Sequence, residues 1–142
     1  MIVTEVATPG SAPLRVWEPV AVAAGYPSPA QDYDRTEIDL VSEIVKDKTS
    51  TFFLRVAGES MSEAGISDGD VIVVDRSLTP ASGDVVVAVL DGMLTVKRLD
   101  VSHRGVTLRA ENRHHPDIVV DELSELTIWG VVTTCLHHLR AS

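Results

Sequence analysis

From residue 51 onward, short apolar runs rich in β-branched residues follow one another, separated by turn residues. Valine-rich runs of this length are typical of strands. Two of them flank Asp91-Gly92, which is among the strongest short signals for a hairpin. The chain is therefore predicted to be mostly β, with strongly curved antiparallel sheets or a small barrel-like sandwich. The expected strands are residues 51–56, 71–74, 85–90, 93–99, 106–110, 118–120 and 127–134.

One helix is expected, over residues 39–46. Asp39 is a suitable N-cap, because its carboxylate can accept from the free N–H groups of the first turn. Leu40 and Ile44 lie one turn apart, as do Val41 and Val45, so the segment has one apolar face. About two turns are predicted from this spacing.

Residues 1–35 hold five of the seven prolines and show little periodicity. Residues 1–6 fit a short strand, but residues 8–13 and the prolines after Gly25 favour irregular structure. The predicted organisation is a flexible N-terminal arm over 1–35 and a β-rich domain over 36–142.

The predicted hairpin fixes the surroundings of Lys97. With a two-residue turn at Asp91-Gly92, Val86 lies opposite Lys97, which shares a face with Ala88 while Arg98 points the other way. If this face is buried, desolvation favours the neutral amine, which can act as a base. The alternative is a solvent-exposed strand lysine, which is the commoner case.

Ser60 also has two interpretations. The residues from Ser60 to Glu63 fit a capping box that opens a single helical turn ended by Gly65. The free N–H groups of such a turn could also hold an oxyanion beside a nucleophilic serine. The nucleophile elbow of α/β-hydrolases is excluded, since Ser62 stands where that motif has its second glycine.

Charge and cysteine content narrow the classes of function. Twelve Lys and Arg against 21 Asp and Glu give a net charge of −9, which disfavours direct nucleic-acid binding. Cys135 is the only cysteine, so no intrachain disulfide forms, and we expect it in the core. With neither a signal peptide nor an apolar run near 20 residues, a cytoplasmic protein without a membrane segment is expected.

Other candidate sites are weak. The histidines at 114, 115, 137 and 138 form two adjacent pairs, which lack the i, i+4 spacing of two metal ligands on one helix face. A Ser-His-Asp triad is compatible with the composition, but no histidine lies near a recognisable motif. No metal site and no cofactor are expected.

Several motifs, in order, resemble the LexA/UmuD self-cleaving peptidases. The resemblance covers about residues 20–134, and it is weak before residue 20. The stretch from Gly25 to Ala30, followed by Asp32 and Tyr33, is similar to the UmuD branch of that family. The motifs that match in order are residues 58–61, 65–70, 83–87, 95–98, 111–112 and 129–132.

The resemblance implies a LexA-like C-terminal-domain fold and a specific set of functional residues. Ser60 becomes the nucleophile and Lys97 its general base. The scissile bond becomes Ala24–Gly25, whose small residues suit a narrow groove. The backbone N–H groups of Glu59 and Ser60 become the candidate oxyanion hole.

The resemblance also implies partners. Such proteins act in the SOS response to DNA damage as homodimers whose autocleavage is promoted by the RecA filament on single-stranded DNA. The trimmed dimer joins a UmuC-type polymerase to form translesion DNA polymerase V. A repressor is not expected, since 24 residues before Gly25 are too few for a helix-turn-helix domain, and neither is a membrane-anchored signal peptidase. The alternative is a non-enzymatic interaction module that regulates a polymerase or dimer partner through its arm.

Overall fold

A computed structural model describes residues 1–9, 14–17, 35–121 and 123–140. The chain divides into two compact units, one made of residues 1–9 and 47–142 and the other of residues 10–46. This division differs from the expected one at residue 35, because the first nine residues belong with the β-rich domain. Among the described residues, no helix is long and apolar enough to cross a membrane.

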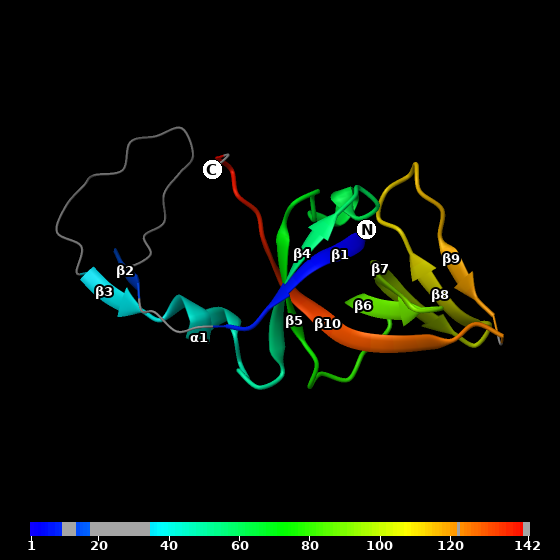
Figure 1. Ribbon diagram of the computed structural model, residues 1–142, viewed down its shortest axis with the longest axis horizontal. Coiled ribbons are helices and arrows are strands. Elements are labelled where there is room, and N and C mark those ends of the chain that lie inside the picture. Colours follow the sequence, from blue (N-terminus) through cyan, green and yellow to red (C-terminus); the bar gives the residue numbers. More distant parts are fainter. Residues whose placement is uncertain (10–13, 18–34, 122, 141–142) are drawn as a thin grey trace. The chain divides into compact units, whose positions relative to one another are not determined.

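The larger unit is one antiparallel sheet that curls on itself (Figure 1). Within the described residues its strands run in the order β1-β4-β5-β10-β6-β7-β8-β9, and β1 also pairs with β7. This additional pairing closes the first six strands of that order into a ring, from which β8 and β9 extend. The strands are β1 (Ile2–Ala7), β4 (Thr51–Ala57), β5 (Val71–Asp75), β6 (Val85–Leu90), β7 (Met93–Ser102), β8 (Gly105–Arg109), β9 (Ile118–Val120) and β10 (Leu126–Leu136). The predicted mostly antiparallel β fold is confirmed.

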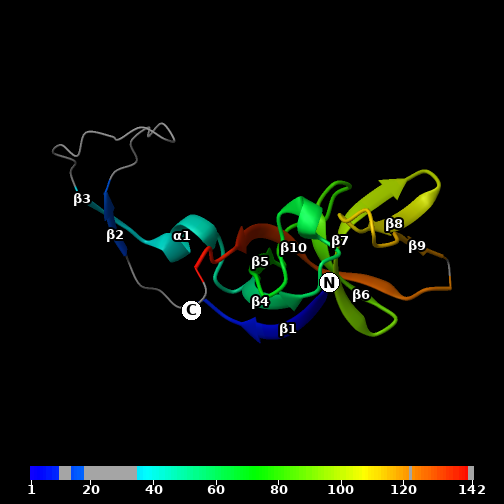
Figure 2. The same ribbon diagram turned by 90° about the horizontal axis from the view of Figure 1, so that it is seen from above.

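Strand β1 completes the ring. Along most of its length it pairs with β4, from Ile2 opposite Ala57 to Ala7 opposite Phe53. At its start, Ile2 also lies opposite Thr95 of β7. Both views place β1 beside β4, with the N-terminus near β7 (Figure 2). Residues 1–7 are thus a structural strand of the domain.

Two apolar clusters form the core, and they lie on opposite faces of the β6–β7 hairpin. Val87 and Val96 belong to the first cluster, which also contains the side chain of Met1. Val86 and Ala88 belong to the second cluster, which also contains Leu108 of β8. Because successive strand residues point to opposite faces, this one hairpin contributes to both clusters.

The predicted register of the hairpin is confirmed. Leu90 pairs with Met93 and Val86 with Lys97. Asp91 and Gly92 both have positive φ, 48° and 83°, as a two-residue turn of type I′ requires. This turn determines which face Lys97 occupies.

The smaller unit contains a hairpin of β2 (Leu14–Trp17) and β3 (Arg35–Ile38), followed by α1 (Leu40–Ile44). Neither of these two strands was predicted from the sequence. The helix confirms the expected cap, since Asp39 Oδ1 accepts from the N–H of Ser42 at 3.2 Å. The proposed cleavage bond, Ala24–Gly25, lies outside the described residues.

Candidate active site

Ser60 lies in the turn that follows β4, and only 2% of the residue is exposed. The turn begins at Gly58, whose φ of 102° is a left-handed conformation that glycine adopts without strain. The Gly58 N–H donates to Asp68 Oδ1 at 2.8 Å, which ties the turn to the loop before β5. The backbone thus directs Ser60 inward, toward β7.

The capping-box interpretation of Ser60 is wrong. The single turn of 3₁₀ helix, η1 (Ser62–Ala64), starts one residue later than expected, with Met61 at the N-cap and no side-chain cap bond. Glu63 does not reach back to Ser60 but accepts from the backbone N–H of Arg113 at 2.8 Å. The expected end of the turn at Gly65 is confirmed, with φ of 86°. The hydroxyl of Ser60 is therefore available for other contacts.

Lys97 is 6% exposed, so the alternative of a solvated strand lysine is wrong. Its cross-strand partner Val86 is fully buried, so Lys97 lies on a face of the hairpin that is shielded from solvent. Desolvation lowers the pKa of Lys97 from its ordinary 10.5, while a hydrogen bond to the N-terminal amine and the charge of Asp117 oppose this shift. Burial is the largest effect, and it favours the neutral amine.

The two side chains meet across the fold. Lys97 Nζ donates to Ser60 Oγ at 2.9 Å, within a buried contact between residues 37 apart in sequence. Once the amine loses its proton, the same distance places a lone pair where it can accept the hydroxyl proton. Geometry and desolvation thus favour the same proton transfer.

A third group at the pair was not foreseen from the sequence. The α-amine of Met1 donates to Ser60 Oγ at 2.6 Å. Desolvation, followed by the charge of Lys97, lowers the pKa of this amine from 8.0 to about 6. The Met1 carbonyl in turn accepts from the N–H of Val96 at 3.1 Å. No motif marks residue 1 for this position, because the contact arises only when β1 closes the ring.

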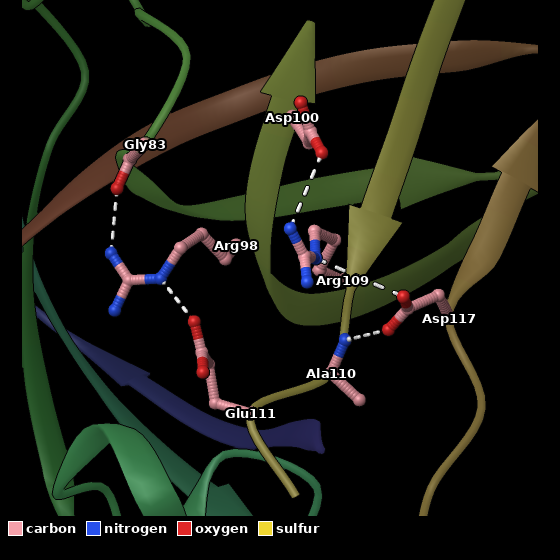
Figure 3. A network of polar contacts seen from close by, with 7 residues as sticks. All are labelled: Gly83, Arg98, Asp100, Arg109, Ala110, Glu111 and Asp117. Carbon is pink, nitrogen blue, oxygen red and sulfur yellow. Dashed lines mark hydrogen bonds and ion pairs between the residues drawn. The ribbon is translucent and has the colours of Figure 1, made fainter. Parts of the chain in front are cut away.

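The loop after β8 holds the Ser60 turn from the other side. The Glu111 N–H donates to the Ser60 carbonyl at 2.8 Å, and Asn112 Nδ2 donates to the Glu59 carbonyl at the same distance. The carboxylate of Glu111 accepts from Arg98 Nε, and Arg98 also donates to the Gly83 carbonyl at 2.6 Å (Figure 3). Since Arg98 directly follows Lys97, this network links the strand of the lysine to the turn of the serine.

The candidate oxyanion donors are the backbone N–H groups of Glu59 and Ser60. The carbonyls of Glu59 and Ser60 are both occupied, by the N–H of Ser62 at 3.1 Å and that of Glu111. Within the described part of the chain, the N–H groups of Glu59 and Ser60 themselves donate to no protein acceptor. Unpaired N–H groups next to a nucleophile are what a developing oxyanion requires.

Cys135 and His137 form a separate cluster around Asp70. Cys135 Sγ lies 3.3 Å from Asp70 Oδ2, and His137 Nδ1 lies 2.6 Å from Asp70 Oδ1. Burial, together with the Asp70 carboxylate, raises the pKa of the Cys135 thiol to about 12, which makes it a poor nucleophile. In the described residues, no group of three or more His, Cys, Asp or Glu side chains is arranged to hold a metal.

A buried serine paired with a desolvated lysine on a small curled β-sheet defines the chemistry of a serine–lysine hydrolase. Comparison with known proteins agrees with this class. Residues 15–133 match the model of the Peptidase S24-like family. The chain belongs to this family of serine peptidases, which use a serine–lysine dyad.

Curated relatives cover most of the chain. Protein MucA of Escherichia coli is 46% identical over 81% of this chain and 79% of its own length. Protein SamA of Salmonella typhimurium strain LT2 is 42% identical over 84% of the chain and 82% of its own length. The LexA repressor of Magnetococcus marinus is 39% identical over 85% of the chain, but over only 52% of its own length. MucA and SamA, which are UmuD-like, are thus matched over most of their own length.

Proposed function

We propose that this protein is an SOS-response autopeptidase that cleaves its own Ala24–Gly25 bond with Ser60 as nucleophile and Lys97 as general base. The observation that carries this proposal is the buried 2.9 Å contact between Lys97 Nζ and Ser60 Oγ. Structural lysines seldom lie buried against a hydroxyl, because burial of the ammonium is costly. A peptidase benefits from that arrangement, since it makes the amine a base.

The proposed reaction accounts for each atom. Ser60 Oγ attacks the carbonyl carbon of Ala24 while its proton passes to the Lys97 amine, and the oxyanion is held by the N–H groups of Glu59 and Ser60. The bond to the Gly25 nitrogen then breaks, and that nitrogen takes the proton from Lys97. A water molecule then gives a proton to the same amine and attacks the ester carbonyl carbon. The bond to Ser60 Oγ breaks, Lys97 returns the proton to Oγ, and the carboxyl group of Ala24 is released.

Incubation of the purified chain at alkaline pH tests the dyad. Mass spectrometry should detect fragments of residues 1–24 and 25–142 from the wild type but not from Ser60→Ala or Lys97→Ala. The matched controls are Ser102→Ala and Lys48→Ala, since both residues are exposed and outside the site. Cleavage of Ser60→Ala at the wild-type rate, or an intact wild type, would favour a non-enzymatic interaction module.

The proposal extends to partners. The similarity to UmuD-like relatives supports a homodimer whose cleavage is stimulated by the RecA filament on single-stranded DNA. A filament that favours the docked arm would act by shifting a population rather than by supplying catalytic groups. The trimmed dimer would then serve as a subunit of translesion DNA polymerase V with a UmuC-type polymerase.

These partners can be tested at neutral pH. RecA with single-stranded DNA and a nucleotide should accelerate cleavage of the wild type, whereas RecA without DNA should not. Sedimentation should give twice the chain mass, and the 25–142 product should bind a UmuC-type polymerase more tightly than Ser60→Ala does. Equal rates with and without the filament would contradict the regulatory part of the proposal.

A further inference from the structure

The N-terminus of this chain occupies the candidate active site as a peptide with a free amine. The Met1 nitrogen lies 2.6 Å from Ser60 Oγ, the atom to which Lys97 Nζ also donates. A peptidase that has just cut a bond would hold the newly formed amine of the product in this position, because that nitrogen has taken its proton from the base. The contact therefore has the geometry of a product complex.

The direction of β1 agrees with this interpretation. The strand leads away from Ser60 in the N-to-C direction, with Ile2 opposite both Ala57 of β4 and Thr95 of β7. Residues that follow a scissile bond leave the nucleophile in the same direction. Addition of a strand to the edge of a sheet by backbone pairing, as β1 pairs with β4, is also a common way to bind an extended peptide.

The site is built around Met1 in particular. Its carbonyl accepts from the Val96 N–H at 3.1 Å and from Thr95 Oγ1 at 3.0 Å. Its side chain is part of the first core cluster and the residue is 8% exposed. The turn at Gly58 also packs against Met1, since a Cβ at Gly58 would lie 3.4 Å from Met1 Cα, in ordinary van der Waals contact. Hydrogen bonds to the backbone and packing of the side chain thus both hold Met1 in the site.

We propose that β1 occupies the groove meant for the residues after the scissile bond, with the Met1 amine in the place of the Gly25 nitrogen. The chain is then its own product-like inhibitor. Gly25 and the residues after it reach Ser60 only when β1 leaves, on the same subunit or on a second copy. This inference depends on the proposed cleavage at Ala24–Gly25, but occupancy of the groove is measurable without it.

The first experiment measures occupancy by chemical labelling of the full wild-type chain. A brief acylation at pH 9, above the ordinary amine pKa of 8.0, is compared in buffer and in urea, with sites read by peptide mass spectrometry. The Met1 amine should react about tenfold or more slowly in the folded chain than in urea. Exposed Lys48 should show little change and serves as the internal reference. Equal Met1 labelling in both conditions would overturn the proposal.

The second experiment turns β1 into a substrate. The residues Met-Val-Ala-Ala are added before Met1, copying Val22 to Ala24, so that an alanine carbonyl lies at Ser60. The extended chain should be trimmed back to Met1, and Lys97→Ala in the same background should prevent this. An extension that ends in tryptophan is the matched control, because a narrow groove rejects it.

The outcomes separate this inference from the proposed function. Two outcomes support competition for one groove. Either the extension is trimmed back to Met1, or the extension is retained and cleavage at Ala24–Gly25 becomes faster. If the extension is retained and the rate of cleavage at Ala24–Gly25 is unchanged, the proposal that β1 fills the groove is overturned. If no chain is cut at any pH, the proposed function fails, and the labelling of Met1 alone then decides whether β1 fills the groove.

Discussion

The backbone N–H of Glu111 donates to the carbonyl of Ser60, and the side chain of Glu111 binds Arg98, the neighbour of Lys97. Glu111 thus holds the turn of Ser60 to the strand that carries Lys97. Neither Glu111 nor Arg98 touches the Ser60 hydroxyl in the structure, so both act as positioning residues. Their contribution should appear in the rate of cleavage rather than in the pH at which cleavage occurs.

Arg98→Met tests this positioning role. The substitution keeps the length of the side chain but removes its bonds to Glu111 and to the Gly83 carbonyl. Self-cleavage should slow by about 10- to 100-fold, because small misplacement of reacting groups is costly. The pH profile should keep its shape. Arg104→Met, at an exposed turn residue, is the control, and equal rates in the two variants would contradict the prediction.

The rate of self-cleavage should rise with pH. In the proposed reaction the neutral form of Lys97 is the base, and burial lowers the pKa of Lys97 from 10.5. Below that lowered pKa, the neutral fraction grows about tenfold per pH unit, and above it the rate reaches a plateau. The plateau should begin below pH 10.5. A series of rates from pH 6 to pH 11 measures this, and a rate that falls with increasing pH would exclude Lys97 as the base.

Gly58→Ala should affect both stability and cleavage. The left-handed φ of Gly58 makes alanine unfavourable by about 1–2 kcal/mol. Gly105→Ala is a matched control, since Gly105 has φ of 124° but open space around its Cβ position. Urea denaturation should show a similar loss of stability for both variants. Only Gly58→Ala should change the cleavage rate, because Gly58 belongs to the Ser60 turn and contacts Met1, whereas Gly105 does neither.

Asp70 should control both acid stability and the thiol of Cys135. Burial favours protonation of Asp70, but hydrogen bonds from the Ser67 N–H, His137 and Cys135 outweigh it, so its pKa is lowered from 3.8. Its stabilising effect is therefore present above the unfolded value and lost as the pH falls through the folded one. Asp70→Asn should lower the free energy of unfolding at pH 7. In urea titrations this free energy should also fall less steeply between pH 5 and pH 2 in the variant than in the wild type.

The same variant should make Cys135 more reactive. The wild-type thiol, with a pKa raised to about 12, should react slowly with iodoacetamide at pH 8. Removing the negative charge of Asp70 favours the thiolate, so alkylation of Asp70→Asn should be faster. The rate in urea gives the reference for a fully exposed thiol. Unchanged alkylation in the variant would mean that burial alone protects Cys135.

The local pattern of apolar residues was sufficient to predict most strands of the sheet, because these strands alternate with strong turn signals. The Asp91-Gly92 turn was informative beyond its own residues, since a two-residue loop fixes the register and hence the face of Lys97. Whether that face was buried depended on β8 and the second cluster, which the hairpin sequence does not encode. The resemblance to self-cleaving peptidases was therefore needed to choose between a buried and an exposed lysine.

The features that were not predicted correctly from the sequence share one physical cause, because each depends on contact between distant segments of the chain. Ser60 fits a capping box locally, yet Lys97 and Met1 contact its hydroxyl in the folded chain. Residues 1–6 fit a strand, but only the closure of the ring shows that this strand belongs to the domain. Hairpin β2–β3 joins segments that lie on either side of a proline-rich stretch, and no turn signal connects them.

Ser60 and Lys97 stand on segments that come together only after the sheet has formed, 37 residues apart along the chain. A polypeptide still emerging from the ribosome, or one unfolded by heat, has no adjacent hydroxyl and amine and so no means of cutting itself. The proposed self-cleavage is thereby reserved for molecules that have finished folding. The amount of trimmed product would report how much of a newly made population has reached the native state.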